Sequence, residues 1–261
     1  MKDKKLSRYS RSKEIIQKDG WAVLIKKGYR YIQEYFDKSI NKIFTRFYTK
    51  GFHKLLYYSF FDKTESPNIY WLGISTEKCP FDMWVYQEMI YETKPEVIIE
   101  TGTRHGGSAL FFAHICGLVG KGEVITIDIN ECDISHPRVT KIIGSSVSNE
   151  VINKVKEIVS DKTAMVILDS DHSKNHVLKE MELYSSFVSV GNYLVVEDTN
   201  INGHPVLPSF GEGPMEAVRE FFKNRKDFEV DQSREKFLVT FFPKGFLRRI
   251  KSENPPEEEE K

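Results

Sequence analysis

The sequence predicts an α/β fold with a doubly wound, mostly parallel sheet, and three observations indicate it. Short apolar runs alternate with segments of helical periodicity from residue 80 to residue 230. Two of these runs, AMVIL and NYLVV, are followed at once by carboxylates, and strand interiors exclude such charges. A third run, VIIE, passes into the glycine-rich turn TGTRHGGS. Open parallel sheets place their ligands at this edge, so we expect the site there.

The expected elements follow in order along the chain. A helix is expected to begin at Asp82 and to end before Lys94-Pro95, because proline disfavours helical conformation in the preceding residue. Strands are expected at 97–100, 123–129, 139–144, 164–169 and 192–198, with helices at 108–120, 148–159, 174–188 and 213–224. This alternation predicts parallel pairing through right-handed crossovers. FEVD and KFLVTFFP are expected to form an antiparallel pair at the end.

Four parts of the chain differ in composition. We expect a basic, amphipathic helical extension at residues 1–63, a connector at 64–79, an α/β domain at 80–246 and a disordered acidic tail at 247–261. The whole chain has 261 residues, is 40% hydrophobic and has no net charge. Its three cysteines share no metal-ligand spacing, which indicates a reducing compartment. We therefore expect a cytoplasmic protein, and no apolar stretch is long enough to span a membrane.

Residues 1–63 hold 16 basic and 6 acidic side chains. Lys38, Lys42, Arg46 and Lys50 recur every four residues, and aromatic residues fall on another face. One interpretation is a helical cap packed on the α/β domain. The other is a segment that rests on an anionic membrane surface, which would place the protein at the inner face of the membrane. Nucleic acid is not expected as a partner, because no reading motif accompanies the charge.

The glycine-rich turn predicts a ligand that is smaller than a dinucleotide. Glycine permits a sharp turn and close approach of a ligand, and the following helix offers free N–H groups to an anion. The spacing from Glu100 through Gly102 and Gly106 to Ser108 departs from GxGxxG and fits a ligand that carries a carboxylate. Asp128 ends the next expected strand and is suited to ribose hydroxyls.

The two carboxylate clusters predict a divalent-metal site. Hard ions such as Mg²⁺ prefer carboxylate oxygens, and Asp171, Glu197 and Asp198 could supply three of them. Asp169 is an alternative or a neighbour. His172 and His204 flank the clusters and are candidates for proton transfer. Zinc is disfavoured because no cysteine or paired histidine joins them.

The segments PFDMWVYQEMIYETKPEVIIETGTRHGGSALFFA and LDSDHSK…VVEDTNINGHP resemble the cephalosporin hydroxylase / rhamnosyl O-methyltransferase family over about residues 78–245. More broadly, the chain resembles class I, metal-dependent O-methyltransferases. The resemblance implies S-adenosylmethionine and Mg²⁺ as cofactors, with Asp171, Glu197 and Asp198 on the metal. It implies Lys174 as the general base, by the Asp-His-x-Lys order of catechol-type enzymes, although those enzymes carry Asp-Asn where this chain has Glu197-Asp198. The implied cofactor-binding residues are Glu100, Gly102, Thr103, Gly106, Ser108, Asp128, Ser146 and Asp169.

We therefore expect methyl transfer from S-adenosylmethionine to a hydroxyl of a sugar, a glycolipid or a related small molecule, with Lys174, His172 or His204 taking the proton. Two alternatives stay open. An oxygenase could hold iron in the acidic site, although such iron sites usually have two histidines and one carboxylate. A non-catalytic module could bind a membrane or a glycan. The sequence identifies neither the acceptor nor the oligomeric state, so a homo-oligomer stays open.

Overall fold

A computed structural model describes residues 8–61 and 69–251, and the chain forms two compact units, residues 1–52 and 53–261. Helix α1 (Arg8–Phe60) makes up the described part of the first unit and continues into the second. Its last two turns lie within the second unit, where His53, Tyr57 and Phe60 surround the Phe241 ring. Within the expected extension of residues 1–63, the part from His53 to Phe60 therefore packs in the larger unit.

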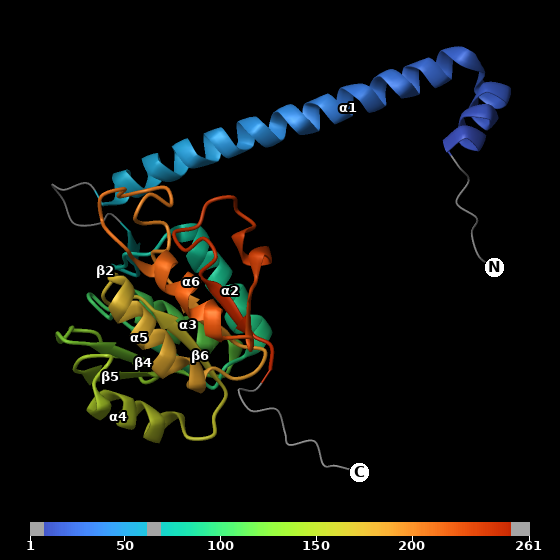
Figure 1. The fold of residues 1–261 in the computed structure, drawn as a ribbon. Helices are drawn as coiled ribbons and strands as arrows, with labels where there is room; N and C mark the ends of the chain where they lie inside the picture. Colours follow the sequence, from blue (N-terminus) through green and yellow to red (C-terminus); the bar gives the residue numbers. More distant parts are fainter. Residues whose placement is uncertain (1–7, 62–68, 252–261) are drawn as a thin grey trace, which may run out of the picture. The chain divides into compact units, whose positions relative to one another are not determined.

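A seven-stranded sheet organises the second unit, in the order β5-β4-β3-β6-β7-β9-β8 (Figure 1). The five parallel strands are β3 (Val97–Thr101), β4 (Glu123–Asp128), β5 (Val139–Ile143), β6 (Ala164–Leu168) and β7 (Tyr193–Val196). Strand β9 (Phe246–Arg249) pairs antiparallel with β7, and β8 (Phe228–Val230) pairs antiparallel with β9, so β8 runs in the same direction as β7. A separate hairpin pairs β1 (Tyr70–Trp71) with β2 (Ile74–Ser75). The doubly wound, mostly parallel sheet predicted from the sequence is confirmed.

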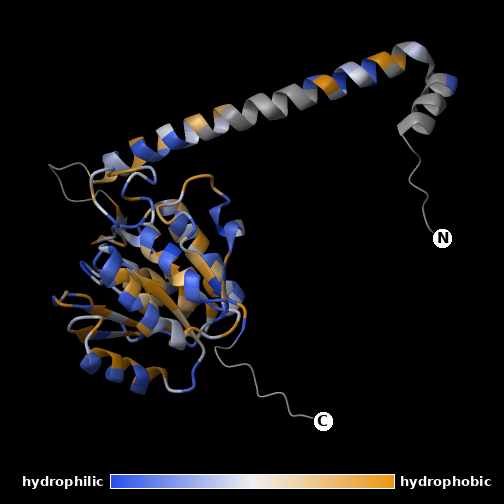
Figure 2. Cartoon of the chain, viewed as in Figure 1, coloured by the Kyte–Doolittle hydropathy of each residue, from blue (hydrophilic) through white to orange (hydrophobic). Residues whose placement is uncertain are grey.

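The connecting helices cover both faces of this sheet. Alternate residues of each strand point to opposite faces, so neighbouring strand residues belong to different cores. Ile98 of β3 packs in one core with α2 (Pro80–Thr93) and α3 (Gly107–Val119). Its neighbours Val97 and Ile99 pack in the other core, with α4 (Asn149–Val159), α5 (Lys174–Tyr184) and α6 (Pro214–Asn224). Figure 2 accordingly shows hydrophobic strands between helices with hydrophilic outer surfaces. Two short 3₁₀ helices occupy Ser185–Phe187 and Gln232–Glu235.

The C-terminal hairpin differs from the sequence-based expectation in its second strand. The apolar run KFLVTFFP forms a loop, and β9 lies beyond it at Phe246–Arg249. The run is apolar because Phe241 and Phe242 fill the core between α1 and α2. From the sequence alone, a buried loop of this kind has the same apolar pattern as a strand. Strand β9 also extends past residue 246, where the domain was expected to end, while residues 252–261 of the expected tail lie outside the described part.

Two further observations bear on the N-terminal part and on α2. Among the described helices, none is both long enough and apolar enough to cross a bilayer. Helix α2 begins at Pro80 rather than at Asp82, since proline suits the first turn of a helix. Asp82 is instead buried, and its Oδ2 accepts a hydrogen bond from the backbone N–H of Phe241, 2.8 Å away.

Candidate active site

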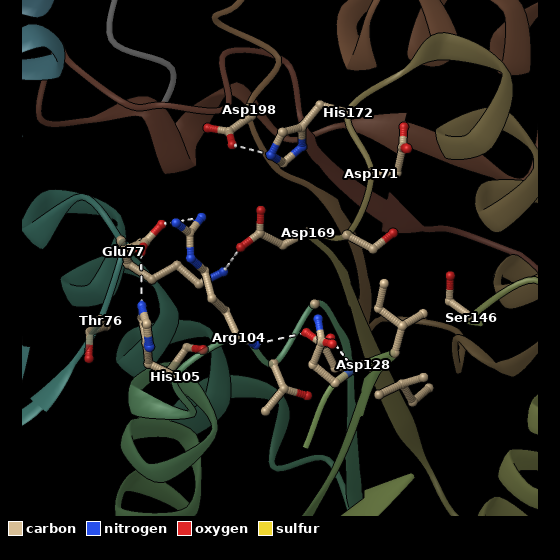
Figure 3. A pocket seen from close by; sticks show the side chains of 18 of the residues that line it. Thr76, Glu77, Arg104, His105, Asp128, Ser146, Asp169, Asp171, His172 and Asp198 are labelled. Carbon is tan, nitrogen blue, oxygen red and sulfur yellow. Dashed lines mark hydrogen bonds and ion pairs between the residues drawn. The ribbon is translucent and has the colours of Figure 1, made fainter. Parts of the chain in front are cut away.

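A large open pocket of about 1170 Å³ lies at the carboxyl edge of the parallel strands (Figure 3). Loops after β3, β4, β5, β6 and β7 contribute to it, together with the segment between β2 and α2. The pocket therefore occupies the edge predicted from the sequence. Its lining includes these predicted residues: Gly102, Thr103, Ser108, Asp128, Ser146, Asp169, Asp171, His172 and Asp198.

Glu100 at the end of β3 is fully buried and only half satisfied. The hydroxyl of Thr126 donates to its Oε2 at 2.8 Å, whereas Oε1 is buried without a hydrogen-bond partner. Burial raises the pKa of this carboxyl, although Lys78 nearby opposes the shift. A buried carboxylate oxygen without a partner is costly. Glu100 itself is not among the residues that line the pocket, whereas Gly102, Thr103 and Ser108 beside it are.

Gly102 and Gly106 shape the turn that carries Glu100 to α3. Both have a left-handed backbone, with φ of 86° and 84°. A Cβ on Gly102 would lie 1.9 Å from the backbone oxygen of Asp169, and one on Gly106 would meet the Ile134 side chain at 2.6 Å. Both glycines are therefore required for the backbone to pass closely here, and Gly102 fixes this turn against the end of β6.

Asp128 and Ser146 lie at the ends of the next two strands of the sheet. Asp128 accepts backbone hydrogen bonds from Arg104 and Asn130, each at 2.8 Å, which fixes the orientation of its carboxylate beside the pocket. Ser146 follows β5, is buried, and has its hydroxyl 3.2 Å from Nε2 of His176. Thr103 is also buried beside the pocket, with its hydroxyl 2.6 Å from that of Thr126.

One group of acidic and imidazole side chains in the described part of the chain could hold a metal ion, and it consists of Asp169, His172 and Asp198. One ligand atom from each lies within 4.8 Å of the others, and Nε2 of His172 is 3.2 Å from Oδ2 of Asp198. Asp198 adopts a left-handed backbone conformation (φ 51°), which reverses the chain directly after β7. Burial raises the pKa of its carboxyl to about 6, with His172 opposing the shift.

Two of the three metal ligands expected from the sequence face other partners. Asp171 lies at the pocket wall, and its Oδ1 accepts a hydrogen bond from the backbone N–H of Ser173 at 2.7 Å. Glu197 is buried, and its Oε1 accepts hydrogen bonds from Lys78 Nζ at 2.8 Å and from the Tyr86 hydroxyl at 2.6 Å. Of the expected set, only Asp198 belongs to the acid and imidazole group described above.

Two of the three expected proton acceptors lie away from the pocket lining. Lys174 begins α5 and pairs with Glu212 at 3.2 Å. His204 pairs with Glu216 at 2.8 Å. His172 is the one of the three that lines the pocket.

Sequence reasoning did not identify Lys78, which is nearly completely buried beside the acidic group. Its Nζ forms ion pairs with Asp169 and with Glu197. Burial opposes the charged form of Lys78, but attraction to these carboxylates outweighs it, and the pKa of Lys78 is raised. We therefore assign a protonated lysine that compensates the two carboxylates. Burial raises the pKa of Glu197, with Lys78 opposing the shift. The two carboxylate partners of Lys78 lie far from it in the sequence, so no local pattern indicates the pairing.

Several other pocket residues also escaped the sequence analysis. Glu77 pairs with Arg104 at 2.7 Å and with His105 at 3.4 Å, and so connects the segment before α2 to the turn after β3 (Figure 3). Apolar and aromatic side chains also line the pocket, and we call the following set the apolar wall: Tyr57, Phe60, Phe61, Ile201, Leu207 and Phe210. The pocket thus has a polar part at the strand ends and an apolar part beside the end of α1.

The strand order, the antiparallel strand beyond β7 and the pocket at the carboxyl edge are those of the class I methyltransferase fold. Solved structures of CmcI share this fold. The one described as containing Mg and SAM has a TM-score of 0.55 and 23% identity, over 70% of this chain and 77% of that one. The CmcI apo-structure has the same TM-score and coverage at 22% identity.

A family model described as Rhamnosyl O-methyltransferase/CmcI matches residues 63–250. The rhamnosyl O-methyltransferase of Mycobacterium leprae is 40% identical over 207 residues, which cover 76% of this chain and 89% of the relative. Its counterpart in Mycobacterium tuberculosis is 43% identical over 191 residues, with 69% and 77% coverage. The chain belongs to the Rhamnosyl O-methyltransferase/CmcI family.

Proposed function

We propose that this protein transfers a methyl group from S-adenosylmethionine to a hydroxyl group of a sugar-containing acceptor, with Mg²⁺ in the site. The observation that carries the proposal is the arrangement of one pocket. Glu100, a buried carboxylate with an unpartnered oxygen, ends β3 beside the lining residues Gly102 and Ser108, and the carboxylate and imidazole group follows the next two strands of the sheet, β6 and β7. The curated relatives carry the name rhamnosyl O-methyltransferase, which supports the sugar hydroxyl as acceptor.

The cofactor fits the residues after β3, β4 and β5. Oε1 of Glu100 would accept from the amino group of the methionine end, and the start of α3 would receive its carboxylate. Asp128 would accept from the ribose hydroxyls, and Ser146 would lie beside the adenine. Gly102 and Gly106 act through the backbone turn, because their missing Cβ atoms leave room for protein rather than for a ligand.

A magnesium ion fits the carboxylates of Asp169 and Asp198, since this ion is bound by one or two carboxylates and keeps other positions for water and substrate. When bound, the ion would lower the pKa of the acceptor hydroxyl. The single histidine argues against an iron oxygenase site, which uses two histidines and one carboxylate. His172, released from Asp198, would accept the hydroxyl proton, and the strand-end residues would align the acceptor with the methyl group.

The apolar wall supports an acceptor with an apolar group next to its sugar. Phe60, Phe61 and Phe210 line the same pocket as Asp198 and could contact an alkyl or aryl aglycone. A glycolipid combines the two chemical characters. A free sugar would leave this wall in contact with water.

The test combines binding and turnover. Calorimetry with S-adenosylhomocysteine should give measurable affinity, and Glu100→Gln should weaken it about tenfold or more, since the amide offers the methionine amine no charge. Labelled S-adenosylmethionine with Mg²⁺ and a series of alkyl rhamnosides should then give a methylated sugar, and longer alkyl chains should lower KM. Absence of binding would refute the cofactor. Binding without transfer to any sugar hydroxyl would refute the acceptor class.

We also propose peripheral contact with an anionic membrane through the first unit. Trp21, Ile25 and Ile32 of α1 are more than half exposed and share one helix face, at spacings of four and seven residues. Lys26 and Arg30 fall on the opposite face. Aromatic and basic residues so divided are typical of helices at a lipid interface.

Vesicle co-sedimentation tests this contact. The full chain should bind vesicles rich in anionic lipid, and binding should weaken with salt because each basic residue near the surface contributes electrostatically. The double substitution Trp21→Ala and Ile25→Ala should reduce binding, whereas Leu118→Ala, at an exposed apolar position on α3, should not. Absence of binding at low salt would leave α1 without this role.

A further inference from the structure

Beside the pocket, a hydrogen-bonded group connects the end of β5, the end of β6 and the first turns of α5. It consists of Ser146, Ser170, His176 and Glu180, and the first three line the pocket. Nε2 of His176 lies 3.2 Å from the hydroxyl of Ser146 and 3.2 Å from that of Ser170. One ring nitrogen therefore contacts two hydroxyl groups on neighbouring loops.

The direction of these hydrogen bonds follows from Glu180. Its side chain is fully buried, and Oε1 accepts the hydrogen of the Ser170 hydroxyl at 2.7 Å. The same oxygen lies 3.6 Å from Nε2 of His176. A bare Nε2 would direct its lone pair at this carboxylate and at a hydroxyl whose hydrogen is already used. Only the Ser146 hydroxyl could donate to such a lone pair, whereas a hydrogen on Nε2 faces three oxygens that can accept it. We therefore assign a hydrogen to Nε2, shared between the oxygens of Ser146 and Ser170.

The hydroxyl hydrogen of Ser146 is then not used within this group. Its Oγ accepts from His176, so its own hydroxyl hydrogen points away from the group and is available to a ligand in the pocket. The backbone carbonyl of Ser146 accepts from the hydroxyl of the fully buried Tyr184 at 2.8 Å, which fixes the residue in place. The nearby Glu180 carboxylate also raises the pKa of His176, in agreement with a hydrogen on Nε2.

We propose that His176 and Glu180 are positioning residues that make Ser146 a hydrogen-bond donor, and that Ser146 thereby selects a ring nitrogen of the cofactor's base. The proposal rests on the proposed function, which places adenine beside Ser146. It explains why a buried glutamate is kept next to a pocket histidine. A donor at Ser146 would favour adenine, because adenine has unprotonated ring nitrogens that can accept a hydrogen bond.

Three analogues of S-adenosylhomocysteine test this, each with one of N1, N3 or N7 replaced by C–H. We expect one of them to bind the wild-type protein about tenfold more weakly than S-adenosylhomocysteine, the loss that one hydrogen bond implies. The gap should fall to less than about twofold in Ser146→Ala and in His176→Leu, because the donor is absent or no longer oriented. It should persist in His176→Gln, whose amide N–H can donate in place of Nε2.

If all three analogues bind the wild type as tightly as S-adenosylhomocysteine, or if the gap persists in Ser146→Ala, the positioning role is wrong. Thermal melting of each variant separates lost discrimination from lost folding, and Ser146→Ala decides the matter should His176→Leu not fold. Failure of the wild type to bind S-adenosylhomocysteine would instead overturn the proposed function, and this inference with it.

Discussion

Nζ of Lys78, in the segment before α2, lies 2.8 Å from Oε1 of Glu197, which directly follows β7. Both are almost fully buried, at 3% and 4% exposure, so neither charge is compensated by water. The Tyr86 hydroxyl donates to the same carboxylate oxygen. Glu197 is therefore engaged inside the protein and does not line the pocket, whereas Asp169, which also pairs with Lys78, and Asp198 both do.

Lys78→Met should destabilise the protein strongly, by about 3–5 kcal/mol, because removing one partner of a buried ion pair leaves the other charge uncompensated. Urea unfolding measures the change. The double variant Lys78→Met with Glu197→Gln should lose less than the sum of the single variants. Lys121→Met is the matched control, since Lys121 forms an exposed pair with Glu96 and should cost less than about 1 kcal/mol. An equal effect of Lys78→Met and Lys121→Met would contradict the finding.

The metal site makes a second prediction that separates neighbouring aspartates. Asp169→Asn and Asp198→Asn should each weaken Mg²⁺ activation of methyl transfer more than about tenfold, because each removes a charged ligand. Asp171→Asn should leave the activation constant nearly unchanged, since Asp171 is bonded to the Ser173 backbone. Titration with Mn²⁺ followed by electron paramagnetic resonance gives the same comparison without turnover. A loss in Asp171→Asn equal to that in Asp198→Asn would restore the ligand set predicted from sequence.

The fold could be predicted from sequence because its cause is local. Runs such as AMVIL have an apolar side chain at every position, and β6 is buried on both faces. The KFLVTFFP run has the same local character but packs as a loop around Phe241, with α1 on one side. No neighbouring residue in the sequence indicates that packing, since the contact comes from a helix far earlier in the chain.

The site could be predicted only in part, for a related reason. Carboxylates at strand ends indicated where a ligand would bind, and Asp128, Asp169 and Asp198 all line the pocket. Which oxygens face the cavity depends on the backbone after each strand, such as the left-handed conformation of Asp198, and no composition rule gives it. Lys78 lies 91 residues from Asp169 and 119 from Glu197, so its role depends wholly on the tertiary fold.

A third prediction concerns the proton acceptor. His172→Gln should lower kcat by about 10²–10⁴-fold, the usual contribution of a general base, while S-adenosylhomocysteine affinity stays within about threefold. Lys174→Met should change kcat little, because Lys174 pairs with Glu212 outside the pocket lining. Steady-state kinetics on both variants at several pH values makes the comparison. If Lys174→Met abolishes turnover and His172→Gln does not, the base is the lysine that the family resemblance implies.

The last prediction concerns stability and pH at Asp82. Burial raises the pKa of this carboxyl from 3.8 to about 7, with hydrogen bonds from Thr240 and Phe241 opposing the shift. Below about pH 4 the group is protonated in both the folded and the unfolded chain, so it contributes no pH dependence. Between about pH 4 and pH 7 the unfolded chain loses the proton while the folded chain keeps it. Stability should therefore fall as pH rises through this window, and the loss should be constant above it.

Asp82→Asn should remove this slope, because the amide cannot ionise and its oxygen can still accept from the Phe241 N–H as Asp82 does at 2.8 Å. The free energy of unfolding of the variant should exceed that of the wild type by roughly 2–4 kcal/mol at pH 8 and should differ little at pH 4. Urea unfolding across this range measures both. Asp133→Asn is the control for a carboxylate that is not buried, and it should leave the slope unchanged. Parallel curves for the wild type and Asp82→Asn would show that Asp82 is ionised in the folded protein, with its charge stabilised by the Phe241 N–H and the Thr240 hydroxyl.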